Sequence, residues 1–240
     1  MKFKVLLVIP ARYGSTRLPG KPLKKIGDKS LIQRVYERAK KVNCVKTIVA
    51  TDNKKILHHC KTNKMECIMT QKNHLTGTDR ISEVSKKYNF KWVLNIQGDE
   101  PLVNVNDVKS FIRRTLSLHK KQKFSASTLY FKKKENNKFN PNEARLLINK
   151  NNEIIISTRK KITNNSKDNS YLKHIGIYLY QKKFLEKFSK LKERFLEKDQ
   201  SLEHLRIIEN GYKIIALRAN HLTTGIDTLK DLIKVRKFFR

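Results

Sequence analysis

A loop rich in glycine and basic residues lies between Ile9 and Leu23, directly after the first apolar run. Gly14 and Gly20 let backbone N–H groups approach an anion, and guanidinium and ammonium groups suit a triphosphate. The loop is not a Walker A motif, because Pro22 stands where that motif needs serine or threonine. We expect a phosphate site, and the alternative is an ordinary basic surface loop. The small and basic residues of the loop are Arg12, Ser15, Thr16, Arg17 and Lys21.

Two acidic positions follow later strand-like runs. Asp99 ends the segment that begins at Trp92, where a carboxylate is well placed for Mg²⁺, an ion that prefers a few carboxylates plus phosphate oxygens and water. Gln97 beside it carries an amide that can read a sugar hydroxyl, and Glu100 could cap the loop. Asp227 either caps the last helix or faces Asp99 across the sheet, in which case the two carboxylates can share one or two Mg²⁺ ions.

The elements that position these residues alternate between strand and helix. The continuous apolar run Val5–Ile9 is typical of a strand buried on both faces. Such alternation predicts a mostly parallel sheet, in which ligands bind beyond the carboxyl ends of the strands. Chemistry is therefore expected after Ile9, Ile96 and Leu217. Further strands are predicted at 47–51, 66–69, 92–96, 125–131, 146–148, 154–158, 175–180 and 214–217, and the later helices at 106–118, 182–190, 201–210 and 228–239.

The composition adds a strong positive charge. The 240 residues include 54 Lys+Arg and 21 Asp+Glu, which gives a formal net charge of +33 and would fit a nucleic-acid partner. The lysines are spread over the whole chain, however, without a dense basic tail or zinc finger. We interpret the charge as the bias of an AT-rich genome, and expect nucleic-acid binding to be non-specific if it occurs at all.

Cysteine usage and hydropathy favour a protein of the cell interior. Cys44, Cys60 and Cys67 form no CxxC pair, so neither a disulfide framework nor a zinc site is indicated. The apolar run Val5–Ile9 is shorter than the ~7–15 residues of a secretory signal. No run approaches the ~18 apolar residues of a membrane span, so no membrane partner is expected.

Several sequence motifs are spread over essentially the whole chain. They are IPARYGSTRLPGKPL (9–23), TGTDR (76–80), NIQGDEPL (95–102), FNPN (139–142), KHIGIYLY (173–180), LEHLR (202–206), ENGYKI (209–214) and GIDT (225–228). With these motifs the chain resembles the 3-deoxy-manno-octulosonate (KDO) cytidylyltransferases, also called CMP-KDO synthetases. The motifs keep the order of that family, and the first loop combined with QGDEP and HIGIY is very specific. Sialic-acid cytidylyltransferases look similar only in the first motif and in parts of the fold.

The resemblance implies an α/β fold of the nucleotide-diphospho-sugar transferase type, with a mostly parallel central sheet flanked by helices. It implies a single domain over residues 1–240, in which the Lys- and Asn-rich segment 132–175 is an insertion or dimerisation arm, and a homodimer. The reaction would transfer CMP from CTP to the anomeric hydroxyl of KDO, with Mg²⁺ as cofactor and pyrophosphate as second product. CMP-KDO would then serve lipopolysaccharide synthesis in the cytoplasm.

The resemblance also assigns roles to residues. Ala11, Arg12, Ser15 and Lys21 would bind CTP, and Lys21 would form the catalytic group with the metal ligands Asp99 and Asp227. Three of the residues that would bind KDO could instead have structural roles, judged by residue type alone. His174 could be a buried structural histidine, and Arg80 and Glu203 could be charges on a helix surface. The residues that would bind KDO are Arg80, Gln97, Arg159, His174 and Glu203.

One departure from the family concerns His204, which stands where a glutamine is usual. Histidine donates one hydrogen bond where the glutamine amide donates two, which predicts a weakened or reorganised contact with a sugar hydroxyl. Two other functions stay open at this point. One is a cytidylyltransferase for another acidic sugar, such as an amino-KDO or a sialic acid; the other is a basic RNA-binding protein on a degenerate synthetase fold.

Overall fold

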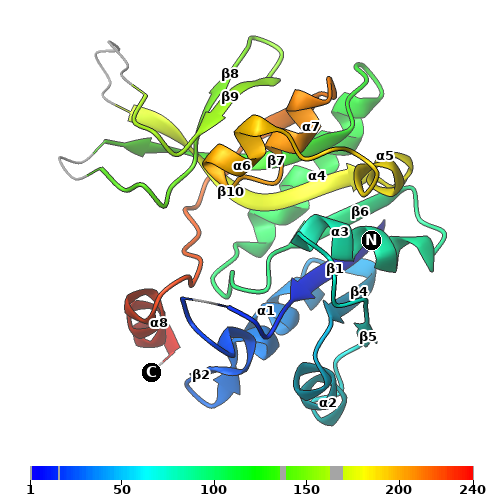
Figure 1. Cartoon of the computed structure of the whole chain (residues 1–240), viewed down its shortest axis with the longest axis vertical. Helices are drawn as coiled ribbons and strands as arrows, with labels where there is room; N and C mark the ends of the chain where they lie inside the picture. Colours follow the sequence, from blue (N-terminus) through cyan, green and yellow to red (C-terminus); the bar gives the residue numbers. More distant parts are fainter. Residues whose placement is uncertain (1, 16, 136–138, 163–169, 240) are drawn as a thin grey trace.

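The computed structural model describes residues 2–15, 17–135, 139–162 and 170–239. Over these ranges a mixed sheet forms the centre of the molecule (Figure 1), and its main path runs β11-β7-β10-β6-β1-β4-β5. The strands on this path are β1 (Phe3–Ala11), β4 (Cys44–Thr51), β5 (Cys67–Met69), β6 (Trp92–Ile96), β7 (Ala126–Lys134), β10 (Ser170–Gln181) and β11 (Ile214–Arg218).

Most neighbouring strands on this path are parallel, as predicted. β1 is parallel to β4 and β6, β4 to β5, and β11 to β7, whereas β10 runs antiparallel to both of its neighbours, β6 and β7. Two antiparallel steps in succession restore the original direction. The carboxyl ends of β1, β6 and β11 therefore lie at one edge of the sheet, which is where the three candidate loops begin.

Helices cover both faces of the sheet because β1 is apolar on both faces. Leu7 and Ile9 pack in one core layer, while Leu6 and Val8 pack in the other, and all four are fully buried. Full burial of each such side chain contributes roughly 1.5–3 kcal/mol. The first layer receives α1 (Leu31–Lys40), α2 (Lys54–Thr62), α4 (Val105–His119) and α8 (Leu229–Arg236), and the second receives α3 (Gly77–Lys86), α5 (Lys182–Phe188) and α7 (Leu205–Glu209).

Short elements complete the chain around the first loop. A 3-10 turn, η1 (Lys21–Leu23), leads into the small hairpin of β2 (Lys25–Ile26) and β3 (Lys29–Ser30). α8 stands beside this hairpin in Figure 1, and Arg236 Nε donates to the Lys25 carbonyl at 3.0 Å. A second 3-10 turn, η2 (Lys237–Phe239), follows α8. Among the described residues, no helix is long and apolar enough to cross a membrane.

The segment 132–175 is joined to the main sheet. β8 (Arg145–Ile148) pairs with β10, and β9 (Ile154–Thr158) pairs with β8, so the hairpin continues the sheet through β10. β7 and β10 extend beyond their predicted ends, because they pair with each other as far as Lys134 and Ser170, where the sequence is polar and lacks apolar alternation. Residues 136–138 and 163–169 of the predicted arm lie outside the described residues.

The predicted helix at 201–210 is shorter than expected. The structure instead forms α6 (Phe195–Gln200), then a turn at Ser201 with φ of 51°, and then α7. The left-handed backbone at Ser201 ends α6, because right-handed helices cannot continue through such a residue. The two short helices place Glu203 and His204 in the connection between them, where His204 is buried and Glu203 is half-buried.

Candidate active site

A lysine and two carboxylates meet at the edge where the strands end. Lys21 Nζ donates to Asp99 Oδ2 at 2.7 Å and to the Ile226 carbonyl at 2.8 Å, and it lies 3.4 Å from Asp227 Oδ1. Asp99 follows β6, and Asp227 follows β11 in the segment that leads to α8. The structure therefore brings together the three residues predicted to be catalytic, although 128 positions separate the two carboxylates.

Backbone contacts hold the two acidic loops together. The Ile226 N–H donates to the Asp99 carbonyl at 2.9 Å, so the two carboxylate-bearing segments are joined directly. Arg17 Nη2 lies 3.0 Å from Asp227 Oδ1, although both side chains are largely exposed. Asp227 thus faces two cations, whereas Asp99 forms an ion pair with the half-buried Lys21 alone among the described residues.

The donor set suits a divalent cation shared with a phosphate. The two carboxylates already flank one positive charge, and carboxylate oxygens are ligands that Mg²⁺ accepts. Within the described parts of the chain, no group of three or more His, Cys, Asp or Glu side chains could hold a metal alone. An ion at Asp99 and Asp227 would complete its shell with phosphate oxygens and water, the usual arrangement for Mg²⁺ in nucleotide enzymes.

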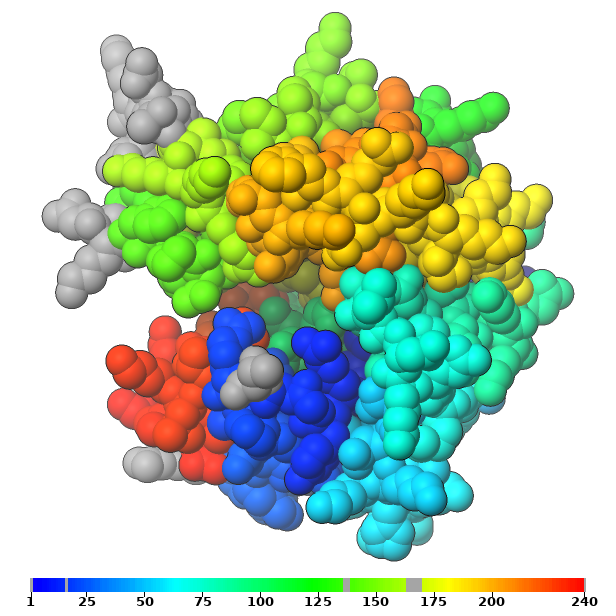
Figure 2. Space-filling view, viewed as in Figure 1, coloured from blue at the N-terminus to red at the C-terminus, as the bar shows by residue number. Residues whose placement is uncertain are grey.

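A cavity of about 230 Å³ opens beside this cluster and contains the predicted nucleotide-binding residues. Ala11, Arg12, Ser15 and Lys21 all line it. In Figure 2 the surface is hollowed between the blue loop that follows β1 and the orange α6–α7 region. The Ser15 N–H, expected to face phosphate, instead donates to the Tyr13 carbonyl at 3.0 Å. Thr16 of the same loop lies outside the described residues.

A second cavity, of about 660 Å³, adjoins the first. Its lining includes Arg159 and His174, two of the predicted KDO ligands. Gln97, Glu203 and Asp227 line both cavities, so they form the boundary between them. A donor and an acceptor substrate held one in each cavity would meet at this boundary.

Arg80 lines only the first cavity and is not a surface charge. Its side chain is 4% exposed and its Nη2 lies 2.7 Å from Asp52 Oδ2. Nη1 also donates to Thr70 Oγ1. These partners hold the guanidinium in one place, so its remaining donor capacity faces the cavity from a fixed position.

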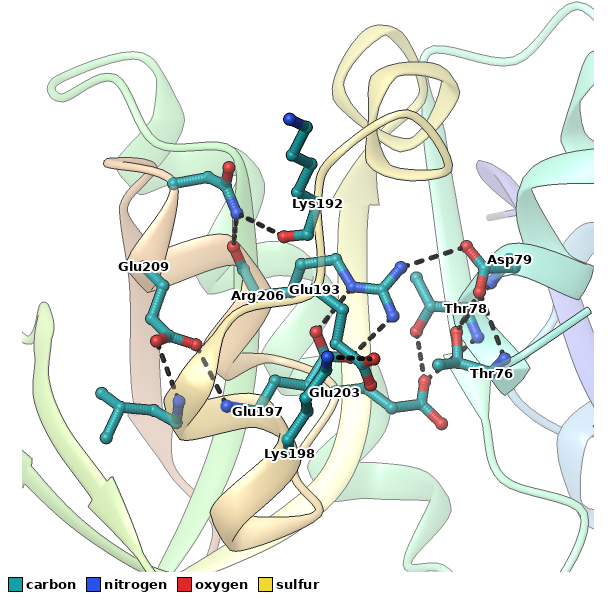
Figure 3. Close-up of polar contacts among 12 residues, drawn as sticks. Thr76, Thr78, Asp79, Lys192, Glu193, Glu197, Lys198, Glu203, Arg206 and Glu209 are labelled. Carbon is teal, nitrogen blue, oxygen red and sulfur yellow. Dashed lines mark hydrogen bonds and ion pairs between the residues drawn. The ribbon is translucent and has the colours of Figure 1, made fainter.

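The carboxylate of Glu203 is hydrogen-bonded to the N-terminus of α3 (Figure 3). Its carboxylate accepts from the Gly77 N–H at 3.2 Å, the Thr78 N–H at 3.1 Å and Thr78 Oγ1 at 2.7 Å. A carboxylate at a helix N-terminus satisfies free N–H groups and complements the helix dipole. Glu203 therefore couples the α6–α7 connection to the helix that carries Arg80.

Arg206 strengthens the same connection and was not singled out by sequence reasoning. It binds Glu197 through two N–H···O bonds of 2.7 Å, and its Nη1 lies 3.5 Å from Asp79 Oδ1 (Figure 3). All three side chains are nearly buried. The LEHLR motif could have indicated this role, because Glu203 and Arg206 lie three residues apart, which is the spacing of two side chains on one face of a helical turn, and both contact α3.

Two histidines, the half-buried His174 and the buried His204, line the larger cavity. His174 Nε2 lies 3.0 Å from Thr128 Oγ1, and its ring centroid is 4.6 Å from that of His204. Burial lowers the pKa of His174 well below its ordinary value and lowers the pKa of His204 to about 3, so both rings are neutral. His204 contacts Tyr178 Oη at 2.9 Å and Ser157 Oγ at 2.7 Å, so both of its ring nitrogens already have protein partners.

Arg159 is held at the wall of the larger cavity by two carbonyl groups. Its Nε donates to the Gln200 carbonyl at 2.9 Å and its Nη1 to the Asn142 carbonyl at 2.6 Å. Both acceptors are neutral, and no carboxylate of the described residues is in direct contact with the guanidinium, so an acidic sugar could neutralise its charge.

Glu100 is a further carboxyl group in the lining of the larger cavity, whose burial sequence reasoning missed. Burial, together with the neighbouring charge of Asp99, raises the pKa of Glu100 to about 8. Its Oε2 atom is buried and has no hydrogen-bond partner among the described residues, and the residue lines the larger cavity. The signal in the sequence was the pair of adjacent acidic residues at the end of a buried strand.

Comparisons with known proteins agree with this geometry. The family model described as cytidylyltransferase matches residues 6–214. A solved structure described as CMP:2-keto-3-deoxy-manno-octonic acid synthetase complexed with CTP superposes with a TM-score of 0.90 at 34% identity, covering 99% of this chain and 98% of that one. A putative glucose-1-phosphate thymidylyltransferase from Bacillus anthracis shares the fold alone, with a TM-score of 0.71 at 15% identity over 98% of this chain and 94% of that one.

The fold and the site together define a nucleotidyltransferase, and the structural match confirms the predicted fold class. The 3-deoxy-manno-octulosonate cytidylyltransferase of Fusobacterium nucleatum is 42% identical over 240 residues, covering 99% of this chain and 97% of the relative. That of Thermodesulfovibrio yellowstonii is 41% identical, covering 95% and 94%. The chain belongs to the 3-deoxy-manno-octulosonate cytidylyltransferase family.

Proposed function

We propose that this protein transfers CMP from CTP to the anomeric hydroxyl of KDO and releases pyrophosphate. The observation that carries the proposal is the cluster of Lys21, Asp99 and Asp227 at the boundary of two adjoining cavities. Relatives at about 40% identity are named for this activity, and the structural neighbour at 34% identity is a complex with CTP.

The protein contributes chiefly position and charge. In phosphoryl transfer little covalent chemistry falls to the enzyme, so holding the reactants in line and neutralising charge dominate. Arg12 and Lys21 hold the triphosphate in the smaller cavity, with Ala11 and Ser15 along the nucleotide. Gln97, at the boundary, orients the sugar hydroxyl toward the α-phosphate.

Asp99 and Asp227 hold Mg²⁺ in this proposal. When bound, Mg²⁺ neutralises charge on the α-phosphate and makes the sugar hydroxyl easier to deprotonate. The support is the chemistry of the donor set, in which two carboxylates from separate strands face one positive charge.

The sugar occupies the larger cavity in this proposal. KDO is an acid, and Arg159 offers its carboxylate a guanidinium that no protein carboxylate neutralises by direct contact among the described residues. His174 contributes a neutral ring beside it. Arg80 acts from the wall of the smaller cavity, and Glu203 acts from the boundary, mainly by holding α3 in place.

We further propose a homodimer and a place in lipopolysaccharide synthesis in the cytoplasm. Leu147, Ile155 and Ile156 on the β8–β9 hairpin are 38%, 58% and 45% exposed, and exposed apolar groups of this kind are typical of an interface. The product supplies activated KDO. Sedimentation of the wild type and of an Ile155→Lys, Ile156→Lys variant tests the dimer, which should dissociate.

Pyrophosphate release tests the reaction itself. Purified protein with Mg²⁺ and KDO is offered CTP, UTP, ATP or GTP in separate assays, and release should require CTP, KDO and the metal together. Replacing KDO by an amino-KDO or a sialic acid tests sugar choice, because a site that binds a hydroxyl rejects analogues lacking it. Folded protein that releases no pyrophosphate with any nucleotide would contradict the proposal, and salt-sensitive RNA binding would then favour the alternative.

A further inference from the structure

The ammonium group of Lys21 stands where a cation would bridge the two carboxylates. It contacts Asp99, Asp227 and the Ile226 carbonyl, and the side chain is 15% exposed. Its backbone is fixed at the start of η1, where Gly20 adopts a φ of 65° and the Lys24 N–H donates to the Lys21 carbonyl. The long flexible stem of lysine, by contrast, allows its charged end to take a second position.

A divalent cation and this ammonium group cannot hold the same carboxylate oxygens together. Like charges repel strongly at contact distance in a partly buried site. A metal ion arriving alone would have to displace Lys21 from three acceptors and leave that ammonium without a partner. Phosphate groups change this balance, because Lys21 also lines the smaller cavity and gains an anionic partner there.

We propose that Lys21 is an internal counterion that keeps free divalent metal out of the site until a nucleotide triphosphate draws its ammonium group away. The metal then enters with the nucleotide, and a metal–nucleotide complex is the form of the substrate that the protein accepts. That the protein accepts CTP as a metal–nucleotide complex rests on the proposed function, whereas the exclusion of free metal does not require any substrate.

Binding of Mn²⁺ in the absence of nucleotide tests the exclusion. Mn²⁺ is titrated into wild-type protein and into Lys21→Met, which retains the apolar stem and removes the charge, and the free ion is followed by electron paramagnetic resonance. Lys21→Met should bind one Mn²⁺ at least about tenfold more tightly than the wild type, because Asp99 then has no cation and Asp227 keeps only the exposed Arg17. Lys24→Met is the matched control, since it removes an exposed charge from the end of the same turn.

Two further variants locate the effect. Lys21→Met combined with Asp99→Asn should lose the gained Mn²⁺ site, and Lys21→Arg, which keeps a positive charge, should exclude Mn²⁺ as the wild type does. Equal Mn²⁺ affinity of wild type and Lys21→Met, with both folded by circular dichroism, would overturn the proposal. A gain that survives Asp99→Asn would overturn it too.

Nucleotide should open the site in the wild type. With CTP present and KDO absent, the wild type should bind one Mn²⁺ more tightly than CTP alone does, and no turnover should interfere. The proposed reaction is tested separately by pyrophosphate release. If the protein excludes free Mn²⁺ but does not use CTP, the proposed function is refuted and the counterion role of Lys21 stands. If the protein turns over CTP but binds free Mn²⁺ well, the counterion role is refuted and the proposed function stands.

Discussion

Gly98 packs so closely against Pro10 that a Cβ atom at position 98 would lie 2.6 Å from the Pro10 carbonyl oxygen. The end of β1 and the loop that follows β6 therefore touch through backbone, immediately before Asp99. Only glycine leaves room for this contact, since backbone cannot move aside as the end of a side chain can. The glycine of the QGDEP motif thus lets the loop that carries Asp99 approach the end of β1, from which the loop with Lys21 continues.

Gly98→Ala should lower stability and displace Asp99. We expect a loss of about 1–3 kcal/mol in the free energy of unfolding, the usual cost of overpacking, measured by chemical denaturation. Gly14→Ala is the matched control, because a Cβ there meets nothing within 4 Å, and it should change stability by no more than about 0.5 kcal/mol. Equal stability of the two variants would contradict the contact.

Asp99→Asn should abolish turnover without unfolding the protein. The amide keeps the shape of the side chain but removes the charge that holds the proposed metal, so kcat should fall at least about 100-fold. Steady-state pyrophosphate release measures this, with a thermal melt to verify folding. Asp28→Asn, in the exposed turn between β2 and β3, should leave kcat unchanged. Near-normal activity of Asp99→Asn would remove this residue from the site.

Lys21→Ala should impair the use of CTP more than the use of KDO. The ammonium group lines the smaller cavity, so its loss should raise KM for CTP several-fold while KM for KDO changes little. Initial rates measured while each substrate is varied in turn separate the two effects. Lys24→Ala serves as the control, and an unchanged KM for CTP in Lys21→Ala would refute the assignment of this charge to the triphosphate.

Arg206→Met should destabilise the connection between α7 and α3. The substitution leaves Glu197 buried without its bidentate partner, which costs about 3–5 kcal/mol for a buried pair. The double variant Arg206→Met, Glu197→Met should lose less than Arg206→Met alone, because the carboxylate of Glu197 is then no longer left buried without its partner. Urea denaturation of both variants measures the difference, and equal losses would show that the ion pair is not the cause.

Glu100 should make stability fall as the pH rises. Its pKa is about 8 in the folded protein against an ordinary value of 4.5, so the folded state keeps a proton that the unfolded chain releases. Stability is therefore lost progressively between about pH 4.5 and 8. Glu100→Gln should flatten the pH profile of Tm over this range relative to the wild type. Parallel profiles for the two proteins would show that Glu100 titrates normally.

The edge of the sheet at which the site lies could be predicted, because strand direction alone decides it. Parallel strands ending at residues 9, 96 and 217 place their following loops together, and this brought Lys21, Asp99 and Asp227 to one point. The partner of each side chain could not be predicted in the same way. Glu203 contacts α3 across 125 positions of sequence, and no local period records such a pairing.

The polar part of the fold was harder to predict than the apolar part. β1 is a run of apolar residues, whereas the outer half of β10 pairs with lysine-rich residues of β7 and carries no alternation of its own. His204 shows the same limit for the site. Its difference from the family's glutamine suggested a changed sugar contact. The ring nitrogens are instead hydrogen-bonded to Tyr178 on β10 and Ser157 on β9.

The insertion of β10 between β6 and β7 sets an order in which the molecule can be assembled. As a ribosome releases the chain, β1, β4, β5 and β6 can pair before residue 170 has been synthesised, but the edge of β6 stays open until β10 arrives. An unpaired strand edge is prone to pair with another chain. The loop after β1 is thus in place before β10 covers the edge of β6, and the second cavity can form only later still, once residues 201–234 that line part of it have been synthesised.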